Sequence, residues 1–453
     1  MDTGSREVRR LRHGRRQTVF VWGVLAGMTV VALGHIAQYG VNVPLAEDWN
    51  MVPVLAGEEP GFWSWVWSQN NEHRLPAARL LSLGMLAVTR DFRAGMVLNT
   101  LLLAVLTSGL VLLARRLRGR TSIVDAFFPV ALLHLGHWEN LMWSWQLQFV
   151  LATAMIGLLL VLLVGVRVPV APGPAALLGG TALLLPFGGG TALPMVPAAV
   201  VGMLAVVWLP RASRRSRLIA LAAVVAAVTL VGVYFIGWEA ATWYPDNPGV
   251  EPTLRTTARV LALGWGPVAE ISYLFFALAA AAVLGSAGVL LLLALSHDDA
   301  QRGRALALLC FLGGIAVTAL AIGYGRAGLQ ATEALPDRYD IVMLPGILAA
   351  WFAWQLFGPP RARRVVQAGL LAVVMLLLPL NIAKGYGWRS WYTTNMAAVE
   401  RDIRAGIPVD GLVQRHGDFL MHWDKEQLAQ RMLMLQRADI GPFADLGVGS
   451  APD

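Results

Sequence analysis

Residues 94–120 read AGMVLNTLLLAVLTSGLVLLARRLRGR, and this stretch decides which kind of fold the chain can adopt. Its first 21 residues, 94–114, contain no charged side chain, and four arginines follow in the next six residues. A helix of about 20 apolar residues crosses the roughly 30 Å hydrocarbon core of a bilayer. The stretch therefore predicts a membrane-spanning helix that ends at a charged interface.

The composition of the whole chain agrees with this local signal. Of its 453 residues, 57% are hydrophobic and only 14% are charged, and the mean hydropathy is +0.59. Such a chain is poorly solvated by water, which indicates a membrane protein. The single cysteine, Cys310, lies in an apolar stretch, so an intramolecular disulfide and a thiolate metal cluster are both excluded.

Searching outward for similar apolar runs predicts an all-α, polytopic membrane protein with about 11 transmembrane helices. The expected spans are 19–38, 94–114, 121–138, 145–165, 174–189, 191–209, 218–237, 268–296, 305–324, 339–357 and 365–383. The first is expected to be an uncleaved anchor because no small-residue cleavage site follows it. PFGGG interrupts the pair at 174–209, and 258–267 could instead form a re-entrant or interfacial helix.

The arginines predict how these spans are oriented. Runs of arginine occur at 6–16, 115–120, 211–217, 302–304 and 361–364, each after an even number of crossings. The positive-inside rule places them in the cytoplasm, together with the N-terminus. We therefore expect a multi-pass protein of the inner (cytoplasmic) membrane, with external segments at 39–93, 238–267, 325–338 and 384–453.

This orientation also accounts for the formal net charge of +8. The expected cytoplasmic segments hold 20 basic and four acidic residues, a net charge of +16, and the remainder has a net charge of −8. The basicity is thus a topology signal, and no nucleic-acid partner is expected. Residues 1–383 are expected to form the transmembrane domain, with interfacial helices in the loop 39–93, and residues 384–453 a short external tail or helical cap.

Candidate catalytic residues come first in the external loop 39–93. Glu47 and Asp48 lie about nine residues beyond the first span, and adjacent carboxylates can raise each other's pKa, which suits one of them to act as a general base. An acidic pair that caps a short helix is the alternative. Farther along, Glu72, His73 and Arg74 could bind an anionic substrate or pair with the acidic residues, or could form a solvated turn.

Polar residues also gather where the third predicted span meets the fourth, in HLGHWENLMWSWQLQF (134–149). His137, Glu139 and Asn140 are expected at or near membrane depth, where polar groups usually line a wet cavity or pair with one another. His134 and His137 could bind a metal from one helix face, but two ligands without a third make a weak site. The tryptophans of this segment and of FWSWVWSQ (62–69) are interpreted as interfacial anchors.

The segment GRAGLQATEALPDRYDI (325–341) holds the candidate phosphate-binding residues Arg326, Arg338 and Tyr339 directly before an apolar span. An arginine at this rim can bind phosphate through two charge-assisted hydrogen bonds, and the tyrosine hydroxyl can add another donor. Snorkelling at the membrane edge is the alternative. The sequence contains no Walker loop, no dinucleotide glycine fingerprint, no HExxH and no GxSxG.

Taken together, these segments resemble the GT-C superfamily of integral-membrane glycosyltransferases over nearly the whole chain. The resemblance rests on the acidic pair after the first span, on EHRLPAARLL (72–81), on MVLNTLLLAVLTSGLVLLARRLRG (96–119) and on DRYDIVMLPG (337–346). The chain departs from the family in having Glu-Asp-Trp as its acidic motif and HRLPAA in place of a double proline. It also has only a short tail where several members have a soluble domain.

The resemblance implies an inverting glycosyltransferase that moves a sugar from a polyprenyl-phosphate donor to a hydroxyl of a cell-envelope glycan or lipid. Asp48, with Glu47 as the alternative, would be the general base, and Arg338 or Arg326 with Tyr339 would hold the lipid phosphate. The expected substrate-orienting residues are Glu72, His73, Arg74, His137, Glu139 and Asn140. No cofactor is expected, although a divalent metal is possible.

A non-enzymatic lipid-linked-sugar flippase or a secondary transporter is the competing hypothesis. Transporters often carry inverted repeats and ionisable groups near the bilayer midplane. In this sequence no repeat is visible, and the polar residues gather toward one predicted face. Convergence of Glu47 or Asp48, Glu139 and Arg338 on one external cavity open laterally to lipid would favour transfer. Scattered positions together with a cavity that crosses the bilayer would favour transport.

Overall fold

The computed structural model describes residues 3–209, 211–298, 301–329 and 335–446. Helices make up most of this part of the chain, and its strands are β1 (Gln69–Asn70) and β2 (His73–Arg74), which pair in antiparallel fashion. The all-α prediction is confirmed. The loop 325–338 is described only outside residues 330–334.

Eight helices of the described chain contain a segment long and apolar enough to cross a membrane. Their bounds are α1 (Thr3–Tyr39), α5 (Arg93–Arg118), α8 (Leu147–Gly165), α11 (Arg214–Phe235), α13 (Tyr273–His297), α14 (Arg302–Arg326), α15 (Asp340–Phe357) and α16 (Pro360–Arg404). The polytopic architecture is thereby supported, whereas the count of eleven spans stays a prediction.

The other three predicted spans coincide with shorter helices. These are η2 (Ile123–Ala126) with α6 (Phe127–Leu132), α9 (Pro172–Leu184) with η4 (Leu185–Gly188), and η5 (Leu193–Met195) with α10 (Val196–Trp208). At 1.5 Å per residue, the helical part of 121–138 covers only about half of the hydrocarbon core. It stops because His134 Nδ1 accepts the backbone N–H of Gly136 at 3.0 Å, which fixes a turn.

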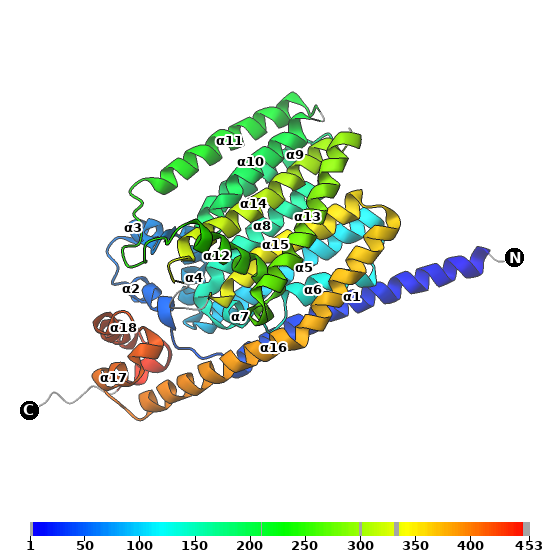
Figure 1. Cartoon of the computed structure of the whole chain (residues 1–453). Helices are drawn as coiled ribbons and strands as arrows, with labels where there is room; N and C mark the ends of the chain where they lie inside the picture. The colour runs from blue at the N-terminus through cyan, green and yellow to red at the C-terminus, as the bar shows by residue number, and fades with distance from the viewer. Residues whose placement is uncertain (1–2, 210, 299–300, 330–334, 447–453) are drawn as a thin grey trace, which may run out of the picture.

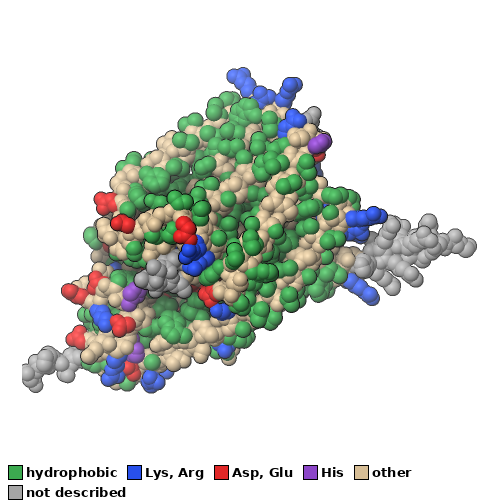
Figure 2. All heavy atoms as spheres, viewed as in Figure 1, with side chains coloured by type: hydrophobic (Ala, Val, Ile, Leu, Met, Phe, Trp, Pro, Cys, Tyr) green, Lys and Arg blue, Asp and Glu red, His purple; other side chains and the backbone are tan. Residues whose placement is uncertain are grey.

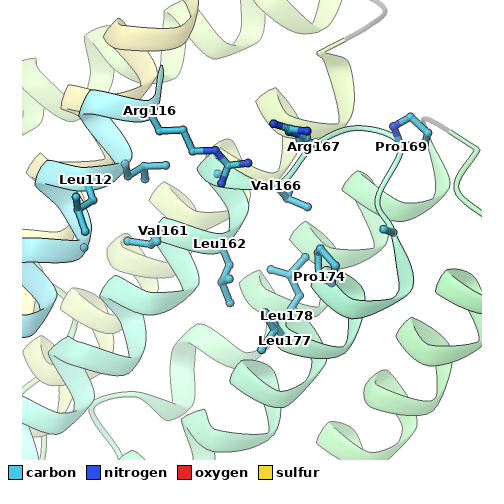
Figure 3. Close-up of a pocket in the computed structure, with 14 residues that line it drawn as sticks. Leu112, Arg116, Val161, Leu162, Val166, Arg167, Pro169, Pro174, Leu177 and Leu178 are labelled. Carbon is cyan, nitrogen blue, oxygen red and sulfur yellow. The ribbon is translucent and has the colours of Figure 1, made fainter. Parts of the chain in front are cut away.

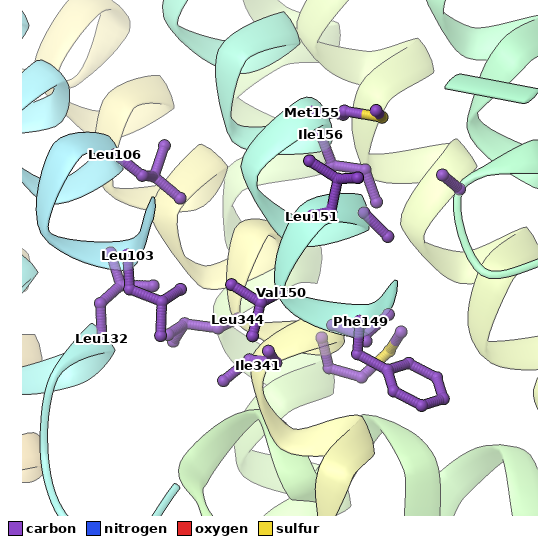
Figure 4. Close-up of a cluster of buried hydrophobic side chains, with 14 of the residues drawn as sticks. Leu103, Leu106, Leu132, Phe149, Val150, Leu151, Met155, Ile156, Ile341 and Leu344 are labelled. Atoms are coloured by element: carbon purple, nitrogen blue, oxygen red, sulfur yellow. The ribbon is translucent and has the colours of Figure 1, made fainter. Parts of the chain in front are cut away.

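Helices α8 and α15 form the centre of the bundle. The most apolar windows of their two spans are 78% and 83% buried, against 22% for each of α1, α11, α13 and α16. Figure 1 shows α8, α14 and α15 inside, α11 at one edge, and α1 and α16 along the opposite edge. Between α5, α6, α8 and α15 the interior is close-packed with aliphatic side chains (Figure 4), among them Leu103, Leu132, Val150, Ile156, Ile341 and Leu344.

Short helices cover one end of this bundle. They comprise η1 (Ala46–Met51), α2 (Val52–Leu55), α3 (Phe62–Trp67), α4 (Pro76–Thr89), α7 (Trp138–Met142), η3 (Ser144–Gln146), α12 (Val250–Ala262), η6 (Leu263–Trp265), η7 (Pro267–Ile271) and η9 (Asp337–Tyr339). The helix suspected near 258–267 corresponds in part to α12, which starts earlier, at Val250. Helix α12 packs against α13 and α14.

The last long helix, α16, extends well past the apolar core. Its 45 residues run through position 383, where the membrane domain was expected to end, and the helix is about 68 Å long. Beyond it, α17 (Val409–Leu420), α18 (Lys425–Arg437) and η10 (Gly441–Asp445) fold back, and α18 packs on α2. On the face seen in Figure 2, acidic side chains gather mainly near this end, and apolar surface covers the middle of the molecule.

Candidate functional site

A cavity of about 670 Å³ lies where the short helices meet the ends of α14 and α15. Segments far apart in the chain enclose it: η1, the β1–β2 turn, the 143 and 243 regions, both sides of the 325–338 loop, and the turn between α17 and α18. Its lining residues are Ala46, Glu47, Asn50, Asn70, Asn71, Trp143, Trp243, Arg326, Leu329, Pro336, Arg338, His422 and Trp423. One carboxylate, two arginines and three tryptophans thus face the same space.

The two members of the acidic pair point in different directions. Both lie in the first turn of η1, in which consecutive side chains leave the helix about a third of a turn apart. Glu47 lines the cavity, whereas Asp48 is 3% exposed and accepts the backbone N–H of Leu45 at 3.3 Å. Asp48, expected to be the base, therefore takes the capping role that the sequence left as an alternative, and Glu47 is the carboxylate that a substrate in the cavity can reach.

Burial dominates the electrostatics of this pair. It raises the pKa of Glu47, an increase that the positive charge of Arg338 partly offsets and the negative charge of Glu139 adds to. Burial also raises the pKa of Asp48 well above its usual value, and the charge of Glu47 contributes to the increase. A carboxylate with a raised pKa is a stronger base, so Glu47 has the proton affinity that a general base requires.

Arg338 is fixed in the cavity wall by Glu139. Its Nη1 lies 2.6 Å from Glu139 Oε1, and its backbone N–H donates to Oε2 at 2.8 Å. The guanidinium carbon lies 6.0 Å from the Trp143 ring centre and 5.9 Å from that of Phe149. Within the described chain, no acceptor contacts the rest of the guanidinium, which leaves donors free for an anion in the cavity. Glu139 therefore positions Arg338.

Arg326, the other predicted phosphate ligand, uses all of its nitrogens on protein groups. Its Nε donates to the Tyr339 hydroxyl at 2.9 Å, Nη1 to the Tyr244 hydroxyl at 2.6 Å and Nη2 to Glu72 Oε1 at 3.0 Å. Burial alone would raise the pKa of Glu72, but His73 and Arg326 outweigh it, so this pKa lies below its ordinary value. Arg326 thus contributes a fixed positive charge to the cavity wall.

The same arginine also borders a second cavity, of about 290 Å³, between η5, α11 and α14. This cavity contains Glu72 and His73 at its polar end, and its other walls are largely apolar. Burial lowers the pKa of His73, and the carboxylate of Glu72, 3.4 Å from its Nε2, only partly offsets this decrease. The apolar lining consists mainly of Leu193, Pro194, Phe235, Ala321 and Ile322. Arg326 and Tyr339 separate the apolar cavity from the polar one.

Arg74 does not face either cavity, although the sequence grouped it with the substrate-orienting residues. Its Nε and Nη2 donate to the carbonyls of Tyr234 and Ile236 at 2.9 and 2.8 Å, and Nη1 donates to that of Trp67 at 2.7 Å. The side chain is 6% exposed. Arg74 therefore holds the β1–β2 turn against the end of α11.

His137 and Asn140 lie behind the cavity wall, where both contact Asp340. His137 Nδ1 is 2.6 Å from Asp340 Oδ2 and its Nε2 is 2.8 Å from the Ala131 carbonyl. Asn140 donates to Asp340 Oδ1 at 3.0 Å and to the Arg338 carbonyl at 3.2 Å. Both nitrogens of His137 face oxygen atoms, so hydrogen bonds hold the ring between Asp340 and the Ala131 carbonyl. The three residues fix the start of α15, and with it Arg338.

The arrangement offers no evident metal centre. Within the described chain, no group of three or more His, Cys, Asp or Glu side chains could hold a metal ion. The rings of His134 and His137 stack with their centres 3.9 Å apart, and each is already hydrogen-bonded. This pair lacks the geometry of two ligands converging on one ion.

Several cavity residues escaped the sequence analysis. Trp143 was expected to anchor at the interface, but it lines the cavity and donates to the Leu45 carbonyl at 3.0 Å. His422 and Trp423 come from the C-terminal segment, for which no site residue was expected. Arg431 of α18 donates to Asn50 at 2.9 Å, and so ties that segment to the cavity. Trp63, in contrast, is 72% exposed, as an interfacial anchor should be.

No protein-family model, curated protein or solved structure matches this chain.

Proposed function

We propose that this protein is a GT-C-like membrane glycosyltransferase that moves a sugar from a polyprenyl-phosphate donor to a hydroxyl of a cell-envelope glycan or lipid. The observation that carries the proposal is that Glu47 and Arg338 face one cavity at the end of the membrane-spanning helices. A raised-pKa carboxylate and a partly free guanidinium match the two charges of such a reaction, a proton that leaves the acceptor and a phosphate that leaves the donor.

In the proposed reaction, Glu47 takes the proton from the acceptor hydroxyl. The acceptor oxygen forms a bond to the anomeric carbon while the bond from that carbon to the phosphate oxygen breaks. The electron pair leaves with the polyprenyl phosphate, whose developing negative charge Arg338 stabilises. A single displacement of this kind inverts the anomeric configuration.

The rest of the cavity suits a sugar. Trp143, Trp243 and Trp423 provide flat apolar surfaces, and the amide groups of Asn50 and Asn70 provide donors and acceptors for hydroxyl groups. Pockets that combine aromatic walls with a few polar groups are typical of small-molecule sites. Because Trp423 comes from the C-terminal segment, that segment is part of the proposed binding site.

The second cavity suits the lipid part of the donor. Its largely apolar walls lie between membrane-spanning helices, and it meets the polar cavity at Arg326. A polyprenyl phosphate that lies along α11 and α14 would place its phosphate near Arg326 and Arg338. In this orientation the cavity faces outward, the arginine-rich ends of α5, α11 and α16 face the cytoplasm, and the enzyme acts at the outer face of the cytoplasmic membrane.

Packing in the middle of the bundle favours transfer over transport. Transport requires a path between the cavity and the opposite side of the membrane. The aliphatic side chains of Figure 4 occupy the interior between α5, α8 and α15, and most of them are completely buried. A flippase or transporter would have to separate these helices over much of their length.

The decisive test is turnover by Glu47→Gln, with Glu251→Gln as the matched control. Glu251 lies on α12, is exposed and pairs with Arg255. The purified variants are incubated with a panel of polyprenyl-phosphate sugars and an envelope extract as acceptor. Loss of a general base reduces turnover by about 10²–10⁴, so we expect that loss in Glu47→Gln and wild-type turnover in Glu251→Gln. Equal turnover by both variants would rule out the role of Glu47.

A further inference from the structure

A separate cavity of about 580 Å³ lies at the opposite end of the bundle, between α5, α8 and α9. Its walls are aliphatic and include Leu112, Val161, Leu162, Leu177 and Leu178. Leu112 is 50% exposed and Leu177 is 61% exposed, so the cavity is a groove open to the surface that faces the hydrocarbon core. Apolar surface of this kind is suited to contact acyl chains.

Two arginines lie at one end of this groove. Figure 3 shows Arg116, from the last turn of α5, and Arg167, from the connection between α8 and α9, at the same end of the cavity, above the aliphatic side chains. Both are exposed, and in the described part of the chain neither forms a hydrogen bond or an ion pair with a protein group.

Two neighbouring arginines at this end of the bundle do form hydrogen bonds or ion pairs with protein groups. Arg118 pairs with Asp125, and Arg304 donates to the carbonyl of Val166, a residue of the groove, and to Gln301 at 2.6 Å. The structure therefore satisfies two arginines internally and leaves two at the groove without a counter-charge. An arginine without a protein partner above an apolar groove can bind the phosphate of a lipid.

We propose that this groove is a binding site for an anionic phospholipid of the membrane leaflet that faces the arginine-rich end. The acyl chains lie against α5, α8 and α9, and the phosphate accepts hydrogen bonds from Arg116 and Arg167. Basic pockets between transmembrane helices bind anionic headgroups in this way. The proposal does not depend on glycosyl transfer.

The site is distinct from the proposed donor site. Helix α8 starts beside the polar cavity and ends at Gly165 in the groove, and α14 runs from Arg302, near Arg304, to Arg326. The 25 residues of α14 correspond to about 37 Å, which is more than the hydrocarbon thickness. A lipid bound in the groove and a lipid bound at Arg326 therefore lie in opposite leaflets.

The experiment measures lipid retention by native mass spectrometry of the full-length protein, titrated with cardiolipin, phosphatidylcholine or polyprenyl phosphate. We expect Arg116→Gln/Arg167→Gln to bind cardiolipin about thirtyfold more weakly, since each arginine near a membrane surface contributes about a factor of five. Arg214→Gln/Arg215→Gln removes two exposed arginines from the start of α11, outside the groove, and should retain cardiolipin as the wild type does.

Gly109→Leu provides an independent variant. Gly109 lines the groove, and a Cβ at this position would meet no atom within 4 Å, so leucine is accommodated and occupies the groove. We expect it to weaken cardiolipin binding while all arginines are present. Equal cardiolipin binding by the two double variants, or wild-type binding of phosphatidylcholine as strong as that of cardiolipin, would each overturn the proposal. An equal loss of polyprenyl phosphate and cardiolipin binding in Arg116→Gln/Arg167→Gln would also overturn it.

Discussion

The two ends of the bundle use arginine in opposite ways. At the polar cavity, Arg326 and Arg338 are held by carboxylates and tyrosine hydroxyls and lie against aromatic rings. At the opposite groove, Arg116 and Arg167 are exposed and make no polar contact with the described chain. Fixed arginines suit a developing charge at a defined position, whereas adaptable ones suit lipid headgroups of variable geometry. Variants at the two ends test this difference between fixed and adaptable arginines.

The largest combined loss of turnover and stability is expected at Arg338. Its loss removes the proposed phosphate ligand and leaves Glu139, which is 6% exposed, without its counter-charge. We expect Arg338→Gln to reduce turnover about 10²–10³-fold and to destabilise the fold by about 3–5 kcal/mol. Turnover assays and thermal unfolding in detergent measure the two effects.

The double variant Arg338→Gln/Glu139→Gln separates the loss of turnover from the loss of stability. It removes the unpaired buried charge, so most of the lost stability should return while turnover stays low. If turnover returned together with stability, Arg338 would have a structural role only.

The pH dependence of turnover tests the acidic pair. As a base, Glu47 acts when deprotonated, so turnover should rise with pH and level off above its raised pKa, falling about tenfold per pH unit below it. Arg338, Glu139 and His422 are the charged or titratable groups that affect Glu47. The same shift has a consequence for folding: because the folded carboxyl binds its proton more tightly, its contribution to stability is lost as pH rises from the ordinary carboxyl pKa to the raised one.

Comparing Glu47→Gln with Asp48→Asn shows which of the two carboxylates causes this pH dependence of turnover. We expect the acidic limb of the kcat/KM profile to persist in Asp48→Asn and to disappear from the residual activity of Glu47→Gln. The reverse result would restore Asp48 as the base.

Arg326 provides a smaller, graded effect. Each tyrosine hydroxyl accepts one of its charge-assisted hydrogen bonds, so Tyr244→Phe and Tyr339→Phe should each cost about 1.5–3 kcal/mol in transition-state stabilisation if the orientation of Arg326 matters. Measured kcat/KM should fall more than tenfold in each variant. Tyr324→Phe is the control, since this exposed tyrosine lies on the same helix and outside both cavities. Unchanged kcat/KM in both cavity variants would show that Arg326 needs no such support.

The sequence alone predicted the long helices better than the points where helices end. Long apolar runs predicted α5, α13 and α14 because each helix contains one run long and apolar enough to cross a membrane. An arginine after such a run marks the end of α5 and of α14. Within the predicted span 121–138 the structure has only a short helix. Apolar composition does not reveal that His134 forms a turn with Gly136 there. Composition predicts membrane character, while local hydrogen bonds decide where a helix stops.

The site was predictable only in part, for a similar reason. The order of spans predicted that Glu47, Arg326 and Arg338 lie on the same side of the membrane, and the structure gathers these three at one cavity. Which carboxylate of the acidic pair faces the cavity depends on the local backbone geometry of one short helix, η1. The contribution of Trp423 depends on a fold in which α18 returns to α2, more than 360 residues earlier in the chain. No local pattern encodes such a contact.

The smallest effect is expected at the groove and completes the comparison of the two ends. Arg116 and Arg118 lie two residues apart on α5, but of these two only Arg118 forms an ion pair within the described part of the chain, with Asp125, whose side chain is fully buried. Without added lipid, Arg116→Gln should change the free energy of unfolding by less than about 0.5 kcal/mol. Arg118→Gln should cost about 3–5 kcal/mol because it leaves the Asp125 carboxylate buried and unpaired. Thermal unfolding in a neutral detergent measures both variants, and adding cardiolipin should stabilise Arg118→Gln and the wild type more than Arg116→Gln. Equal stabilisation of all three by cardiolipin would mean that Arg116 is an ordinary interfacial arginine, and the contrast between the two ends would then be one of burial alone.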